Sequence, residues 1–296
     1  MTLQTPYYLL DKSVLLRNLE KISYLRRTSG VKCVLALKAF ATWGVFDLMA
    51  EHMDGSTSSS LNEVKLGREK FGGETHAYSV AWADHEIDEV IANSDKVIFN
   101  SVSQLERFGE KVEAAGKPMG LRINPGLSHS HFILADPARP FSRLGEWDME
   151  RIRPVLNRVT GVMFHFNCEN DSFDSLDTLL TAIEERYADI LHKLEWVSLG
   201  GGIRFTNEDY PIDALAARQP DVMLVTCRHE AGMAYMAQAA GRLTIAQVIS
   251  SGFGEVEEGR ALQESLVARA AEAGVRVIGP NCLGTYSPRG GLTFPA

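Results

Sequence analysis

Short apolar stretches alternate with segments of helical spacing along the chain, and this alternation limits the fold more than any other feature. Strands that alternate with helices of about 8 to 20 residues are typical of right-handed βαβ units and a parallel sheet. The stretches expected to form strands lie at 33–40, 54–60, 76–82, 96–101, 118–126, 161–167 and 196–203. Seven strands are more than a small doubly wound fold contains. The pattern therefore predicts an α/β chain with a (β/α)8 TIM-like barrel, in which 221–226 is the eighth strand.

Between these stretches, apolar residues recur at helical spacing. The first helix is expected to begin after Asp11, an N-cap residue, and to end at Gly30. The further helices are expected over 45–52, 61–71, 85–92, 102–115 and 172–194.

The composition is that of an ordinary soluble globular protein, with 296 residues of which 45% are hydrophobic and 23% charged. The sequence shows no signal segment and no run of about 18 apolar residues, so we expect a cytoplasmic location and no membrane insertion. Its four cysteines form no C-x-x-C pair, which disfavours disulfides and a sequence-local zinc site; we expect reduced thiols and no metal. The formal net charge of -8 disfavours nucleic acid as a partner and weakly favours a small cationic substrate.

Lys38 lies inside the apolar stretch VLALKAF, where a buried ammonium group would cost several kcal/mol. It could end the strand and extend its amine to water along its apolar stem. Alternatively, it could be a desolvated amine with a lowered pKa, which is the condition for Schiff-base chemistry. The barrel prediction favours the second interpretation, because Lys38 then lies near the carboxyl end of the first strand, where barrels carry their active sites.

Other polar groups are expected at the same end of the barrel. Gly200, Gly201 and Gly202 follow the seventh strand, where backbone N–H groups commonly bind a phosphate. His165 and Asn167 end the sixth strand, and Asn124 lies near the end of the fifth. Each signal has a structural alternative, since glycines make turns and strand histidines are often core residues. A lysine, a phosphate cradle and an imidazole together indicate a pyridoxal phosphate site.

From Thr5 to Ala217 the chain strongly resembles the carboxynorspermidine decarboxylases, pyridoxal phosphate enzymes built like alanine racemase and ornithine decarboxylase. The segments that carry the resemblance occur in the family's order: TPYYLLD, LALKAF, STSSSLNE, YSVAW, FNSVSQL, RINPG, DPARPFSRLG, FHFNCENDSFD and LGGGIRFTNEDYP. The resemblance implies a barrel of the alanine racemase amino-terminal-domain type, with pyridoxal 5'-phosphate as cofactor.

The resemblance also implies roles for individual residues. Lys38 matches the lysine that forms the Schiff base, Gly200 to Gly202 match the phosphate-binding loop, and His165 matches the histidine stacked on the cofactor ring. Glu63 matches a carboxylate near the cofactor, and Arg143 an active-site arginine placed with the substrate. Glu169 and Asp171 lie in a polyamine-facing stretch and could bind substrate ammonium groups. Alternatively, these two acids simply stabilise the amino-terminal end of the following helix.

The implied reaction removes carbon dioxide from carboxynorspermidine or carboxyspermidine to give norspermidine or spermidine. The implied partners are a small cationic polyamine-type substrate and a second copy of the chain, with which it would form a homodimer. Neither nucleic acid nor membrane is expected.

Beyond Ala217 the family pattern breaks off. The family's Glu-Pro-Gly motif after the eighth strand and its β-rich carboxyl-terminal domain are not recognisable here. Instead, 221–244 resembles thiamine diphosphate enzymes around Glu230, and 248–294 resembles nucleoside-diphosphate-forming acyl-CoA synthetases. We therefore expect a barrel domain at 1–217 and an α/β tail of foreign βα units at 218–296 that completes the barrel or packs against it, which suggests a chimeric or generated sequence. The alternatives to decarboxylation are an inert or merely cofactor-binding barrel, or a CoA- or nucleotide-binding module in the tail.

Overall fold

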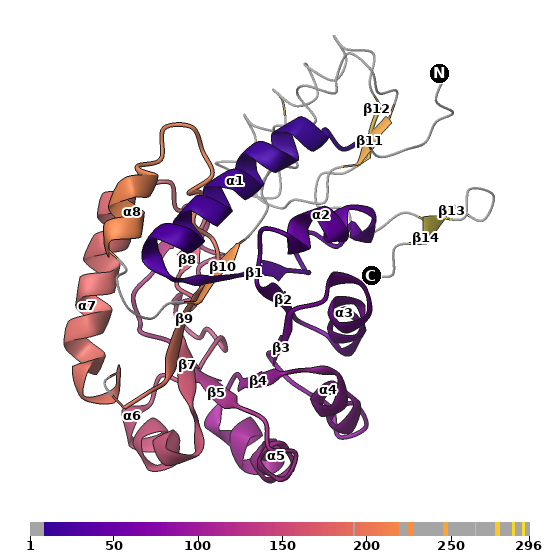
Figure 1. Ribbon diagram of the computed structural model, residues 1–296. Helices are drawn as coiled ribbons and strands as arrows, with labels where there is room; N and C mark the ends of the chain where they lie inside the picture. Colours follow the sequence, from indigo (N-terminus) through magenta and orange to yellow (C-terminus); the bar gives the residue numbers. More distant parts are fainter. Residues whose placement is uncertain are drawn as a thin grey trace. The chain divides into compact units, whose positions relative to one another are not determined.

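The computed structural model describes residues 9–191 and 193–218, together with the backbone of five short strands and Glu264 in the remainder of the chain. Eight parallel strands form a closed barrel, as the alternation in the sequence predicts, and helices lie outside it (Figure 1). The barrel strands in their spatial order are β1 (Lys32–Ala36), β2 (Gly55–Ser58), β3 (Glu74–Ser79), β4 (Lys96–Phe99), β5 (Met119–Arg122), β7 (Gly161–Met163), β9 (Trp196–Gly200) and β10 (Leu224–Cys227), with β10 paired to β1.

The predicted eighth strand is confirmed, because β10 pairs with both β9 and β1 and so closes the barrel. Several predicted strands extend too far at their carboxyl ends. The first ends at Ala36 rather than at 40, and the sixth at Met163 rather than at 167. The reason is that Leu37, Phe164 and Phe166 remain buried in the core after strand pairing has ended, so the apolar pattern outlasts the strand.

The helices follow the predicted spacing closely. α1 (Lys12–Ser29) begins where expected, since the Ser13 N–H donates to Asp11 Oδ1 at 2.8 Å, and Gly30 ends it with a φ of +73°. The other helical segments are η1 (Trp43–Val45), α2 (Phe46–Ala50), α3 (Leu61–Leu66), η2 (Gly67–Phe71), α4 (Ile87–Asn93), α5 (Val102–Ala114), α6 (Met149–Ile152), η3 (Arg153–Arg158), α7 (Phe173–Leu191) and α8 (Ile212–Arg218). The segments α6, η3 and α8 were not predicted, because elements this short carry too few residues to show a helical period.

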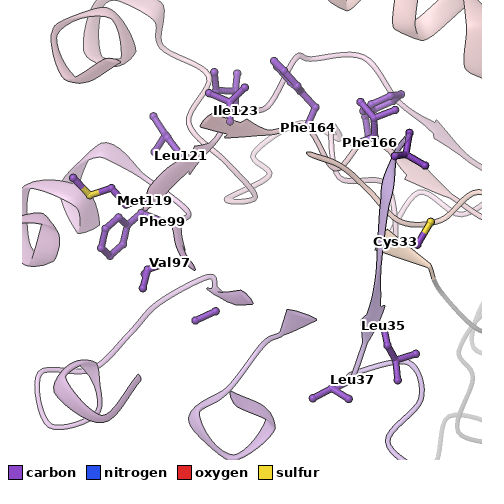
Figure 2. Packing of buried hydrophobic residues seen from close by; sticks show 14 of the residues in the cluster. Cys33, Leu35, Leu37, Val97, Phe99, Met119, Leu121, Ile123, Phe164 and Phe166 are labelled. Carbon is purple, nitrogen blue, oxygen red and sulfur yellow. The ribbon is translucent and has the colours of Figure 1, made fainter. Parts of the chain in front are cut away.

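The buried side chains of the barrel strands alternate between two environments. Residues such as Val97 and Phe99 pack with helix residues in one large core, and Figure 2 shows further members of this core, among them Leu121, Ile123 and Phe164. The intervening residues face the barrel interior, where Tyr78, Ile98 and Met163 form a separate cluster with Trp196. This alternation follows from the period of two along a strand, and it decides which polar residues reach the interior.

Trp196 fills the interior at the amino ends of the strands. A Cβ added at Gly161 would lie 2.1 Å from the Trp196 ring, and one at Gly120 would lie 2.4 Å from it, so glycine makes room for the indole at both positions. Lys96 Nζ lies 4.2 Å from the centroid of the same ring. The amino end of the barrel is therefore packed.

A small two-stranded sheet lies at the carboxyl ends of the barrel strands. β6 (His129–Ser130) belongs to the loop after β5, and β8 (Asn167–Cys168) follows β7; the two pair in parallel. This sheet, which the sequence analysis did not predict, holds two long loops against each other.

Residues 14–230 form one compact unit, and residues 1–13 with 231–296 form another. In the second unit, β11 (Ile245–Gln247) pairs in parallel with β12 (Arg276–Ile278), and β13 (Tyr286–Ser287) pairs with β14 (Leu292–Thr293). The sequence over 246–280 has the pattern of a strand–helix–strand unit, with which the parallel pairing agrees. Apart from Glu264, the segments of helical pattern at 229–241 and 257–273 lie outside the described residues, as do most of the two segments whose resemblances were noted in the tail. Among the described helices, none is long and apolar enough to cross a membrane.

Candidate active site

Lys38 lies in the turn that follows β1, at the carboxyl end of the barrel. Leu37, the residue before it, still donates its N–H to Thr57 O at 2.9 Å and packs in the outer core with Cys33 and Leu35. The Lys38 side chain is exposed, as the first of the two sequence-based interpretations expects. The tight turn after Ala36 ends the apolar run just before the lysine and leaves the amine accessible.

Glu63 lies in the first turn of α3, directly after β2. Its Oε2 accepts the Ser59 N–H at 2.5 Å, and its own N–H donates to the N-cap residue Ser60 at 3.3 Å. This is close to a capping box, so the carboxylate has a clear structural function. Burial raises the pKa of Glu63, while the positive charge of Lys38 opposes the rise. The two residues are therefore near enough to interact electrostatically across the ends of β1 and β2.

His165 and the glycine loop after β9 lie together. His165 belongs to the inward-facing set, because Phe164 and Phe166 on either side of it pack in the outer core. The Gly201 N–H donates to His165 Nδ1 at 3.3 Å. A Cβ at Gly200, whose φ is +70°, would lie 2.6 Å from the same nitrogen. Glycine at position 200 therefore allows the backbone and the imidazole to approach closely.

Gly202 also depends on the absence of a side chain. Its φ is +88°, and a Cβ there would lie 2.1 Å from Asn167 O. The Gly202 carbonyl accepts the Asn170 N–H at 2.7 Å, which joins the glycine loop to the segment after β8. Gly200 and Gly202 are thus both required by close packing, against His165 and against Asn167.

A buried arginine that the sequence analysis overlooked supports His165 from inside the barrel. Arg122, at the end of β5, is 2% exposed and donates to Tyr78 Oη and, at 3.1 Å, to His165 O. Tyr78 Oη in turn donates to Asn100 Oδ1 at 3.0 Å. Tyr78 and Arg122 lie in β3 and β5, whereas Asn100 and His165 follow β4 and β7. A charged residue within the apolar stretch PMGLRINPG was the available signal, the same signal that drew attention to Lys38.

Arg143 and Asn124 lie in the long loop after β5. The Arg143 carbonyl accepts from Asn100 Nδ2 at 2.8 Å, and its side chain is exposed. Asn124 donates from Nδ2 to Pro137 O and Leu144 O, both at 3.0 Å, so it holds the two ends of the loop together. Asn124 thus has a structural role, whereas Arg143 has its backbone fixed and its guanidinium available at the surface.

The acidic stretch after β8 contains two carboxylates in different surroundings. Glu169 has a φ of +57° and its Oε2 lies 3.0 Å from the Arg204 guanidinium, so its charge is already paired. Asp171 is exposed, and its negative charge contributes to the raised pKa of the buried Tyr210 hydroxyl. Neither lies inside α7, which begins at Phe173. Asp171 is therefore the more accessible of the two for a cation.

The matched part of this chain is closely related to known decarboxylases. It is 63% identical over 216 residues to the carboxynorspermidine/carboxyspermidine decarboxylase of Herminiimonas arsenicoxydans, which covers 73% of this chain and 59% of that relative. It is 35% identical over 215 residues to the enzyme of the same name from Campylobacter jejuni, covering 73% of this chain and 56% of that one. The chain thus spans less than two thirds of the length of these relatives. A scan against protein-family models gives no match.

Solved structures show the same relationship. The crystal structure of carboxynorspermidine decarboxylase complexed with norspermidine, from Campylobacter jejuni, superposes with a TM-score of 0.69 at 31% identity, over 78% of this chain and 61% of that one. A diaminopimelate decarboxylase from Helicobacter pylori, complexed with L-lysine, has a TM-score of 0.63 at 18% identity, over 77% and 64% of the two chains, and supports the fold alone. These relatives lend no support to the two resemblances noted in the tail. Over the matched 73% of its length, the chain belongs to the carboxynorspermidine/carboxyspermidine decarboxylase family.

Proposed function

We propose that this protein is a pyridoxal phosphate-dependent decarboxylase that converts carboxynorspermidine or carboxyspermidine to the corresponding polyamine. The observation that carries the proposal is the relationship at 63% identity to a decarboxylase of this name. It is supported by the position of Lys38, His165 and the glycine loop after β1, β7 and β9, at the carboxyl end of the barrel, where such barrels carry their active sites.

The residues present fit the cofactor. Gly200 and Gly202 admit no Cβ, so the backbone of this loop can approach a phosphate closely. The amine of Lys38 is exposed at the same end of the barrel and can bond covalently to the cofactor aldehyde. His165 would lie against the ring. When bound, pyridoxal phosphate supplies an electron sink for the electrons released as the carboxylate leaves.

The chain's own side chains would then bind and orient the substrate and the cofactor and transfer protons. The carboxylate of Glu63 interacts electrostatically with Lys38 and would stabilise its protonated, ammonium form. Arg122 fixes the backbone at His165, so that the imidazole keeps its orientation. Asp171 offers an accessible negative charge for a substrate ammonium group, whereas the carboxylate of Glu169 is already paired with Arg204. Arg143 would attract the substrate carboxylate.

The chain covers 59% and 56% of the two decarboxylases to which it is related. We therefore keep the second hypothesis, a barrel that binds the cofactor without turnover. A homodimer and a cytoplasmic location remain predictions. Among the described residues of the tail, none favours a CoA- or nucleotide-binding module, a thiamine diphosphate site or an acyl-CoA synthetase.

Two measurements test the proposal. The purified chain mixed with pyridoxal phosphate should show a near-visible absorption band that Lys38→Ala abolishes and that Lys70→Ala, a change at an exposed lysine, leaves unchanged. Carboxynorspermidine should then be converted to norspermidine by the wild-type protein alone. A band without product would support the binding-only hypothesis. The absence of any lysine-dependent band would refute both cofactor hypotheses.

A further inference from the structure

Two histidines and an aspartate form a cluster at the carboxyl end of the barrel that the proposed decarboxylation does not use as a unit. The cluster consists of His129, His131 and Asp171, and one potential ligand atom of each lies within 4.8 Å of those of the other two. The rings of His129 and His131 have centroids 5.0 Å apart and planes at 88° to each other. The sequence analysis expected no metal; the one signal for this site is the spacing of the histidines in SHSH.

The small sheet at the end of the barrel brings these residues together. β6 pairs with β8 in the register His129 with Asn167, and the His129 N–H donates to Phe166 O at 3.0 Å. His131 follows β6 directly, in a bend. Asp171 follows β8 and is held by its neighbour Asn170, which is fully buried and donates from Nδ2 to Asn167 Oδ1 at 2.8 Å. The backbone at all three positions is therefore fixed by the fold.

His129 has the environment of a metal-binding histidine. Its Nδ1 lies 2.8 Å from Ser175 Oγ, in the first turn of α7. Its Nε2 is buried and has no hydrogen-bond partner. A buried polar atom without a partner is costly, and a metal ion bound to Nε2 would remove that cost. If Nδ1–H donates to Ser175, the Nε2 lone pair is the one that faces the cluster, which is the usual arrangement of a histidine ligand and its supporting partner.

His131 and Asp171 are exposed, so an ion from solvent can reach the cluster.

We propose that His129, His131 and Asp171 bind a divalent transition-metal ion, of which Zn²⁺ is the best match. Two imidazole nitrogens and a carboxylate oxygen are ligands that zinc accepts in tetrahedral geometry, and three protein ligands leave one position for water or another ligand. Hard cations such as Mg²⁺ prefer sites made only of oxygen atoms and are not expected to bind here. The site shares Asp171 with the proposed substrate-binding groups but does not include Lys38.

Isothermal titration of the full chain with Zn²⁺, without substrate, tests the site. We expect one ion per chain, and a loss of affinity of at least about 10-fold in each of His131→Gln and Asp171→Asn. His85→Gln, at an exposed histidine after β3, is the matched control and should leave the affinity unchanged. The exposed position of His131 makes misfolding of its variant improbable, and circular dichroism of each variant checks this directly.

Two further variants sharpen the test. Ser175→Ala should weaken zinc binding, because it removes the partner of His129 Nδ1, whereas Lys38→Ala should bind zinc like the wild type even where it abolishes the cofactor band. A chain that fails to bind the cofactor could thus still bind zinc, and a chain that fails to bind zinc could still bind the cofactor. Absence of binding at millimolar Zn²⁺, or binding that His131→Gln and Asp171→Asn do not weaken, would overturn the proposal.

Discussion

Substitution of Gly200 by alanine is the most direct test of the contact between the glycine loop and His165. Gly200 has a φ of +70°, and a Cβ there would lie 2.6 Å from Nδ1 and 2.7 Å from both Cβ and Cγ of His165. Two of these atoms lie at the base of the imidazole and cannot move far without a shift of the backbone. The added methyl group therefore causes both conformational strain and a steric clash.

The two contributions can be separated with a control. A left-handed conformation costs a non-glycine residue about 1–2 kcal/mol, and forced overpacking adds about 1–3 kcal/mol. Gly200→Ala should thus lower the free energy of unfolding by about 2–5 kcal/mol. Gly116 has a φ of +64° with nothing within 4 Å of an added Cβ, so Gly116→Ala should show the conformational cost alone. The loss of unfolded-state entropy is common to both variants and cancels in their difference.

Urea unfolding of the two variants, followed by circular dichroism, measures the difference. We expect Gly200→Ala to be the less stable by about 1–3 kcal/mol, the overpacking contribution. It should also bind pyridoxal phosphate more weakly than Gly116→Ala, because His165 must move. Equal losses of stability in the two variants would show that the loop and the imidazole do not make the contact described above.

Two further predictions concern the core and the amino ends of the strands. Phe164→Ala should lower the free energy of unfolding by about 3–5 kcal/mol, because Phe164 is fully buried and packs against Tyr187. Phe141→Ala, at an exposed phenylalanine, should change it by less than about 0.5 kcal/mol. Urea unfolding measures both, and a loss of similar size at the two positions would contradict the described core. Glu74 has its pKa lowered to about 2, chiefly by its hydrogen bond to the buried His76, with Lys32 also close. Its stabilising effect is therefore complete above its ordinary pKa near 4.5 and is lost as the pH falls toward 2, by an amount on the order of 1 kcal/mol because the side chain is partly exposed. Glu74→Gln should flatten the stability profile in this pH range, the exposed Glu69→Gln should not, and a slope unchanged by Glu74→Gln would refute the assignment.

The barrel was predictable because its evidence is local and repeated. Each stretch such as 96–101 shows its own apolar run between turn residues, and eight repeats of one βα unit leave few arrangements for the sheet. The ends of the strands were less predictable. The paired residues of β7 end at Met163, whereas burial continues at Phe164 and Phe166.

The residues of the candidate site also differ in how far the sequence predicts them. Lys38 and the glycines at 200–202 have local signals, an unusual charge in an apolar run and a triple glycine after a strand. Arg122 was missed although it carries the first of these signals, because its importance comes from Tyr78 and His165, which lie on other segments. Resemblance to a known family supplied the remaining assignments.

The sequence by itself thus determined the class of fold, the strand after which Lys38 lies and the relationship to a decarboxylase family. All of these depend on residues close together in the chain or on motifs that recur in relatives. Tertiary structure decided that Lys38 is exposed, that Arg122 supports His165, and that His129, His131 and Asp171 form a cluster. These facts depend on which strand ends lie side by side, and the closed pairing of the barrel and of β6 with β8 sets that order through backbone hydrogen bonds between distant segments.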